Sequence, residues 1–144
     1  MGFNNEQIVR DACQVIWSEG DVSRIDEFYA EDFEAHYLRT NWGTGLQGIR
    51  ALVEEIRGSF PDYREHIDEL IVAGDLVTVR LTIRATHLGP LASYPATGKE
   101  VAFQDVTVLE LRAGKIVSQR GLSDHFALYQ QLGLIEFTPP PAAA

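Results

Sequence analysis

The chain has 144 residues, of which 45% are hydrophobic and 23% charged, as expected for one globular domain with a sizeable core. Its formal net charge is −9 and it has no run of Lys or Arg, so neither nucleic acid nor an anionic membrane is an expected partner. No segment approaches the roughly 20 apolar residues of a membrane span, no signal-peptide pattern is seen, and the single Cys13 allows no internal disulfide. We therefore expect a cytoplasmic protein.

The first 60 residues have the apolar spacing of helices. A first helix is predicted from a cap at Asn4 or Asn5 to Gly20, a second begins at Asp21, and a third covers residues 49–60 before Pro61. The second helix is expected to turn Ile25, Phe28 and Tyr29 inward. Residues 32–37 are predicted as a brief strand, and the glycine-rich residues 38–48 as a loop.

From residue 63 the apolar period changes to two, which predicts strands over 63–72, 76–87 and 99–112 and a last strand after the Ala113-Gly114 turn. A short amphipathic helix follows the last strand. This order of elements predicts a single α+β domain over residues 1–137, with helices covering one face of the sheet. The proline-rich residues 138–144 are predicted to be disordered.

Asp124 lies at the junction between the last strand and the short helix. Counting back by twos places Ile116, Ser118, Arg120 and Leu122 on the same strand face as Asp124. Two interpretations are open. A buried Asp124 can serve as general acid and base, because burial raises the pKa of a carboxyl toward the working pH. Alternatively, Asp124 caps the helix that begins at His125.

Three further residues could carry chemistry. Asp105 interrupts an apolar strand face, so it is either a second carboxylate in a cavity or an edge-facing charge. His87 ends the apolar face formed by Leu81, Ile83 and Ala85, next to a Pro/Gly loop, and is either a functional residue or a hydrogen-bonded rim or core histidine. His36 has the same two interpretations. The four histidines lack metal-ligand spacing, so no metal site is expected.

A series of motifs, in order along residues 5–133, is carried by Gly48-Ile49-Arg50, Phe60-Pro61-Asp62, Gly74-Asp75, Thr86-His87-Leu88-Gly89, Pro95-Ala96-Thr97-Gly98-Lys99, Gly114-Lys115-Ile116-Val117, and Asp124 with Gln131-Leu132-Gly133. With these motifs the chain resembles the SnoaL-like polyketide cyclases of the nuclear-transport-factor-two-like superfamily. The resemblance implies a cone-shaped, cystatin-like α+β barrel, in which three N-terminal helices close a curved antiparallel or mixed sheet. It also implies a homodimer paired through the exposed sheet face.

The same resemblance implies cofactor-free ring closure of a polyketide ester by intramolecular aldol condensation. Asp124 matches the family's acidic residue, and His36 and His87 match histidines that often line its pocket. Arg120 stands where family members frequently carry Trp, and a guanidinium there suits a carboxylate, an enolate oxygen or a partner such as Asp105 or Asp124.

We therefore expect a cyclase, isomerase or related lyase that acts on a small polyketide-like carbonyl compound without a cofactor. Asp124, His87 and His36 are the expected catalytic residues, and the expected substrate contacts are Arg120, Asp105, Trp42, Tyr37, Phe60 and Leu122. Trp42, in its glycine-rich loop, is a candidate lid over the substrate site. One alternative is an epoxide-hydrolase-like enzyme with paired Asp105 and Asp124, and another is a binding protein that holds an apolar ligand without turnover.

Overall fold

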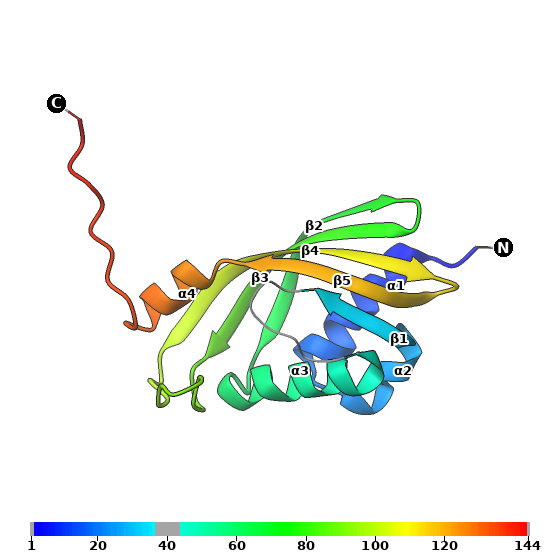
Figure 1. Ribbon diagram of the computed structural model, residues 1–144, viewed down its shortest axis with the longest axis horizontal. Coiled ribbons are helices and arrows are strands. Elements are labelled where there is room, and N and C mark those ends of the chain that lie inside the picture. Colours follow the sequence, from blue (N-terminus) through cyan, green and yellow to red (C-terminus); the bar gives the residue numbers. More distant parts are fainter. Residues whose placement is uncertain (1, 37–43, 144) are drawn as a thin grey trace.

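The computed structural model describes residues 2–36 and 44–143 (Figure 1). Helix α1 (Asn5–Ala12) continues as the π-helical η1 (Cys13–Ser18), followed by η2 (Val22–Arg24), α2 (Ile25–Phe28), α3 (Gly45–Ser59) and, late in the chain, α4 (His125–Gln131). The strands are β1 (Tyr29–His36), β2 (Arg64–Ala73), β3 (Leu76–Thr86), β4 (Glu100–Arg112) and β5 (Lys115–Ser123). None of the described helices is both long enough and apolar enough to span a membrane.

The five strands form one curved, mixed sheet in the order β1-β5-β4-β3-β2, in which only β1 and β5 run parallel. Helices α1, α2 and α3 cover one face of it, whereas α4 lies beyond the end of β5 (Figure 1). We call the helix-covered face the inner face and the opposite one the outer face. The expected α+β domain with a curved mixed sheet is confirmed, although the sheet does not close on itself.

The alternation predicted for β3 and β4 is confirmed, because the apolar positions of both strands are buried on the inner face. Their buried residues are Val77, Val79, Leu81, Ile83, Ala85, Val101, Phe103, Leu109 and Leu111. The core is completed by apolar residues of α1, η1 and α3, including Val9, Ile16, Ile49, Leu52 and Val53. Burial of these side chains provides the main driving force for covering the sheet with helices.

The first helix starts where the sequence predicts, since the Asn4 side chain accepts a hydrogen bond of 3.1 Å from the Gln7 backbone N–H. It does not remain α-helical to its end. In η1 the backbone N–H of Glu19 donates to the carbonyl of Gln14 at 2.9 Å, one residue further back than in an α-helix. Trp17 belongs to this wider turn, and its indole N–H donates to the hydroxyl of Tyr29, at the start of the first strand, at 2.9 Å.

Tyr29 is buried as expected, but it begins β1 rather than closing the second helix. The strand therefore starts three residues before the predicted Asp32. The reason is tertiary pairing, because β1 aligns with β5 from the pair Tyr29 and Ile116 to the pair His36 and Arg120. The periodicity of a short segment cannot predict pairing with a parallel strand almost 90 residues away.

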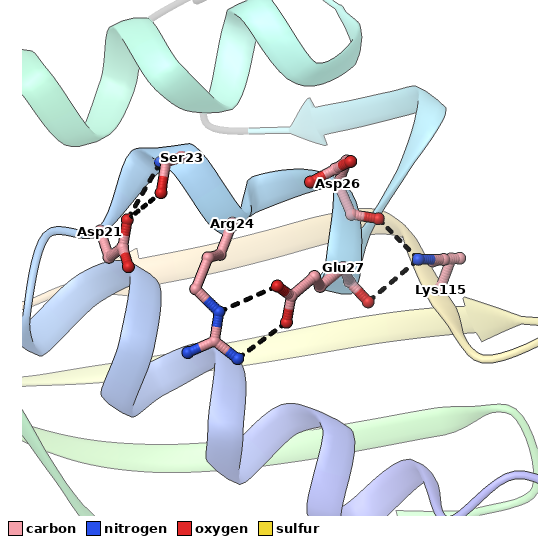
Figure 2. Close-up of polar contacts among 6 residues, drawn as sticks. All are labelled: Asp21, Ser23, Arg24, Asp26, Glu27 and Lys115. Carbon is pink, nitrogen blue, oxygen red and sulfur yellow. Dashed lines mark hydrogen bonds and ion pairs between the residues drawn. The ribbon is translucent and has the colours of Figure 1, made fainter.

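A polar contact fixes the short helix α2 to the turn between β4 and β5. The Lys115 ammonium donates to the carbonyl oxygens of Asp26 at 2.6 Å and Glu27 at 3.0 Å (Figure 2). The Arg24 guanidinium binds both carboxylate oxygens of Glu27 at 2.9 and 2.8 Å and lowers the pKa of that carboxyl. The Lys115 contacts join α2 to the hairpin that carries β5.

Candidate active site

Asp105 lies on the inner face of β4 and is only 7% exposed, so it is not an edge-facing charge. The Thr107 hydroxyl donates to its Oδ1 at 2.5 Å, and the Ser123 hydroxyl of β5 donates to its Oδ2. Ser123 is the cross-strand partner of Asp105, so strand pairing positions one of these donors. Both carboxylate oxygens are thus hydrogen-bonded inside the core, as a buried charge requires.

Glu65 is a second inner-face carboxyl, on β2. The Tyr63 hydroxyl donates to its Oε1 at 3.0 Å, and the Cys13 side chain is a second hydrogen-bond partner of this carboxyl. Burial raises the pKa of Glu65 to about 8, and the negative charge of Asp105 adds to this effect, while the Tyr63 hydrogen bond opposes it. Glu65 therefore keeps its proton at neutral pH.

The thiol of Cys13 lies beside the Glu65 carboxyl, where η1 passes over β2. Burial raises the pKa of Cys13 well above its usual value, and the charges of Glu65 and Asp105 raise it further. A thiol with these neighbours stays protonated, so it is not an activated nucleophile.

His87 is fully buried on the inner side and continues the apolar face of β3. The backbone N–H of Thr97 donates to its Nδ1 at 3.2 Å, and the Thr97 hydroxyl lies 3.0 Å from the same atom. Because Nδ1 accepts a hydrogen bond, a neutral His87 carries its proton on Nε2, which is buried without a partner. The ring of Phe60, itself buried, lies 5.4 Å from the imidazole.

The loop that follows His87 is held tightly against the end of α3. The backbone N–H groups of Leu88 and Gly89 donate to the carbonyl of Ser59 at 3.1 and 3.0 Å. A Cβ atom at Gly89 would lie 1.9 Å from the carbonyl oxygen of Gly58, so only glycine fits there. This close approach explains the Thr-His-Leu-Gly motif in structural terms, because it fixes the position of the imidazole.

Asp124 lies between β5 and α4 and is exposed, so the interpretation of Asp124 as a buried carboxyl is wrong. Its Oδ1 accepts a hydrogen bond of 3.0 Å from the backbone N–H of Ala127 and caps α4, as the second interpretation of the sequence holds. The Asp124 backbone N–H donates to the carbonyl of Gln104 at 2.8 Å. No hydrogen bond to a described residue engages Oδ2.

Helix α4 takes the place of a missing strand beside the start of β4. Because β5 ends opposite Asp105, the residues of β4 that precede it lack a strand partner on that side. The Gln131 side chain fills the gap: its Nε2 donates to the Ala102 carbonyl at 2.9 Å and its Oε1 accepts from the Ala102 N–H at 2.8 Å. Leu128 and Leu132 are buried below it. This docking fixes α4, and with it the carboxylate at its N-terminus.

Arg120 and Leu122 lie on the outer face, away from Asp105, so the expected contact between this guanidinium and Asp105 is wrong. A β-bulge explains the error. Ile116 pairs with Leu111 on the inner face, but the register shifts before Ser118, so every second residue from Ser118 onward faces outward. Simple counting by twos across Ile116 and Arg120 therefore fails.

His36 also lies outward, beside Arg120, and its Nε2 is 3.3 Å from a carboxylate oxygen of Glu34. The predicted catalytic residues thus do not converge: His87 is inside, His36 is outside and Asp124 is at the junction. Tyr37 and Trp42 lie outside the described residues, so their predicted roles stay predictions. Within residues 2–36 and 44–143, no three His, Cys, Asp or Glu side chains gather as a metal-binding group.

Glu65 is the residue that the sequence interpretation missed. The signal was the alternation of Tyr63, Glu65 and Ile67, which places the glutamate between two inward-facing positions of a strand. It is weak because most of β2 is exposed, as befits an edge strand.

The family model described as SnoaL-like polyketide cyclase matches residues 7–132. The chain belongs to the SnoaL-like polyketide cyclase family. Among curated proteins, the aklanonic acid methyl ester cyclase DnrD of Streptomyces peucetius is 28% identical over 91 residues. That match covers 62% of this chain and 62% of DnrD, so the matched part spans less than two thirds of the relative.

Several solved structures share the fold. TsrD from Streptomyces laurentii superposes with a TM-score of 0.83 at 21% identity, covering 94% of this chain and 99% of TsrD. A SnoaL-like polyketide cyclase from Agrobacterium tumefaciens gives a TM-score of 0.78 at 19% identity, covering 91% and 99%. At such identities the likeness supports the fold alone.

Proposed function

We propose that this family member is a cofactor-free enzyme that closes or isomerises a ring of a small polyketide-like carbonyl compound, with Asp124 as general acid and base. An aldol closure requires that a proton be taken from a carbon next to carbonyl groups and that one be delivered to the new alkoxide. A carboxyl group can perform both transfers. The observation that carries the proposal is an anchored carboxylate whose Oδ1 accepts from the Ala127 N–H, while no described residue hydrogen-bonds to its Oδ2.

The open carboxylate distinguishes Asp124 from Asp105. Both oxygens of Asp105 accept hydrogen bonds from hydroxyl groups, so neither is available to remove a proton without breaking one of them. An exposed carboxylate is a weak base in water, and a substrate seated over Asp124 would strengthen it by excluding water. The hydrolytic alternative needs a water between Asp105 and Asp124, and the engaged Asp105 oxygens disfavour it.

For His87, a role as hydrogen-bond donor to the substrate stays a prediction, because this residue is fully buried inside the fold and does not converge with the exposed Asp124 at the junction. The His87 Nε2 proton has no partner, and Thr97 fixes the tautomer that presents it. A donor held in this way stabilises a developing enolate or alkoxide oxygen without reorganisation. His36, Arg120 and Leu122 lie on the outer face and are proposed to act only on a substrate that reaches past the junction.

The match to DnrD makes aklanonic acid methyl ester the first compound to assay. Asp124→Asn keeps the helix cap, because Asn also caps helices, but it removes the base. We expect kcat to fall by at least about a hundredfold with little change in ligand binding. Asp21→Asn is the control, because Asp21 also caps a short helix, accepting from the Ser23 N–H at the start of η2, and is remote in sequence from the junction.

Turnover by Asp124→Asn at the wild-type rate would remove Asp124 from the mechanism. If the wild-type protein binds polyketide esters but converts none of them, the third alternative, a binding protein without turnover, would hold instead.

We also propose a homodimer paired through the outer face, in the cytoplasm. Val106 and Leu122 are cross-strand partners there and are 44% and 71% exposed. An apolar pair on an open sheet face is typical of a contact surface. Leu122→Arg should lower the mass measured by light scattering from that of two chains to that of one, with Leu88→Arg, at an exposed loop residue, as control. A wild-type monomer at assay concentration would contradict the proposal.

A further inference from the structure

The helix that carries Asp124 at its start is short. Helix α4 has 7 residues, and helices much shorter than about 12 residues are marginal in water without tertiary contacts. The hydrogen bond from the Ala127 N–H to Asp124 Oδ1 exists only while the first turn of α4 is intact. The orientation of the Asp124 carboxylate therefore depends on the contacts that hold this first turn.

The contacts with the sheet engage the middle and the end of α4. Gln131 binds both backbone groups of Ala102, and Leu128 and Leu132 are buried. In the first turn, Phe126 lies on the opposite side of the helix from Leu128, because residues two apart are about 200° apart around an α-helix. Its side chain is 49% exposed. The sheet therefore does not cover this side of the first turn.

The chain leaves α4 through a well-defined turn. Gly133 has a φ of +74°, and its N–H donates to the carbonyl of Gln130 at 3.0 Å. The N–H of Leu134 donates to the carbonyl of Tyr129 at 2.9 Å. These two bonds around a left-handed glycine form a Schellman motif, which ends a helix. The Leu134 side chain packs against the core, so the direction of the following segment is fixed.

Phe137 brings this segment onto the first turn of α4. Its ring lies 5.4 Å from that of Phe126 at an interplanar angle of 84°, the edge-to-face arrangement that aromatic pairs favour. Residues 134–137 thus connect the last turn of the helix, through Leu134, to its first turn, through Phe126. We refer to residues 134–137 as the C-terminal strap. The exposed residues 138–143 beyond it are not part of this contact.

We propose that the C-terminal strap positions Asp124. The contact between Phe137 and Phe126 holds the first turn of α4 closed, and the closed turn presents Oδ2 of Asp124 to the substrate in a fixed orientation. Phe137 is a positioning residue, because it acts through the helix and touches no reacting atom. The inference rests on the proposed role of Asp124 in ring closure, and it adds a second requirement to that role.

The test measures hydrogen–deuterium exchange of the Ala127 amide, the donor to Asp124, in the full-length ¹⁵N-labelled protein. Phe137→Ala should speed this exchange by about two- to tenfold, the usual worth of one aromatic pair. Phe137→Tyr keeps the ring and should exchange as the wild type does. Phe3→Ala removes a different exposed phenylalanine and is the matched control, with no expected effect on Ala127.

A double-mutant cycle assigns the effect to the aromatic pair. Phe126→Ala combined with Phe137→Ala should speed Ala127 exchange no more than Phe126→Ala alone, because either change removes the same contact. An unchanged rate in Phe137→Ala, or additive effects of the two changes, would overturn the strap. Equal acceleration at the amides of β3 and β4 would show a general loss of stability and would also overturn it.

The link to catalysis is tested with aklanonic acid methyl ester, the compound suggested by the match to DnrD. Phe137→Ala should lower kcat about two- to fivefold with KM nearly unchanged, because the bound substrate meets a carboxylate that is less often in place. Phe137→Tyr should restore kcat. Faster Ala127 exchange with an unchanged kcat would overturn the positioning role. A wild-type protein without turnover would instead contradict the proposed function, because the exchange measurements do not depend on activity.

Discussion

Two carboxyl groups of this protein, Glu65 and Asp124, have the same chemistry and opposite environments. Glu65 lies between β2 and η1, and burial raises its pKa to about 8. Asp124 is exposed at the junction of β5 and α4, where a backbone N–H donates to it. The comparison shows that a carboxyl at the end of a strand, such as Asp124, is not necessarily buried. An acid on an edge strand, such as Glu65, can be buried.

The difference also separates two chemical roles. A buried, neutral carboxyl is a hydrogen-bond donor, whereas an exposed, anchored carboxylate accepts protons when a substrate excludes water. The buried Asp105 is a third case, because two hydroxyl donors compensate for its burial. Within one small domain, the partners of each acid determine what it can do.

The largest expected effect is on stability, when a buried acid and an exposed acid are each replaced by alanine. Asp105→Ala leaves the hydroxyls of Thr107 and Ser123 without their charged acceptor inside the core, and should lower the free energy of unfolding by about 2–4 kcal/mol. Asp124→Ala removes only a helix cap and should cost about 1 kcal/mol. Urea unfolding of both variants measures the difference. Equal losses would mean that burial does not distinguish the two sites.

The burial of Glu65 should also make the stability of the protein depend on pH. Folded Glu65 keeps its proton to about pH 8, whereas the unfolded chain loses it near the ordinary value of 4.5. The folded state therefore binds more protons between these values, and the contribution of Glu65 to stability falls as pH rises from 4.5 to 8. Glu65→Gln removes this penalty, so its stability relative to wild type should increase steadily as pH rises from 4.5 to 8 and level off above that.

Thermal unfolding at pH 5, 7 and 9 measures this trend, with Glu69→Gln as the control from an exposed position on the same strand. Parallel curves for Glu65→Gln and wild type across the range would contradict the burial of a protonated acid.

Much of the fold follows from the sequence because its signals are local. The helical spacing of α3 and the alternation of β3 and β4 each identify the buried face, and Asp105 and His87 are correctly placed in line with apolar neighbours. The Asn4 cap is also read directly from residue type and position.

The candidate site was less predictable because its geometry depends on features without a local signature. One β-bulge before Ser118 turns Arg120 and Leu122 to the outer face. Parallel pairing with β5 extends β1 to Tyr29, and the docking of Gln131 on Ala102 fixes α4. Glu65 lies where η1 packs against β2, and its backbone N–H donates to the Ser18 hydroxyl at 2.9 Å. None of these contacts is encoded by spacing within a single segment.

The most direct test of the contrast between a buried acid and an exposed one is a ¹³C NMR titration of the side-chain carboxyl groups, with Glu65→Gln used to assign the signal of Glu65. Our account predicts that the Glu65 carboxyl titrates with a midpoint near pH 8. A midpoint between about 4 and 5, the range of an ordinary glutamate, would contradict it.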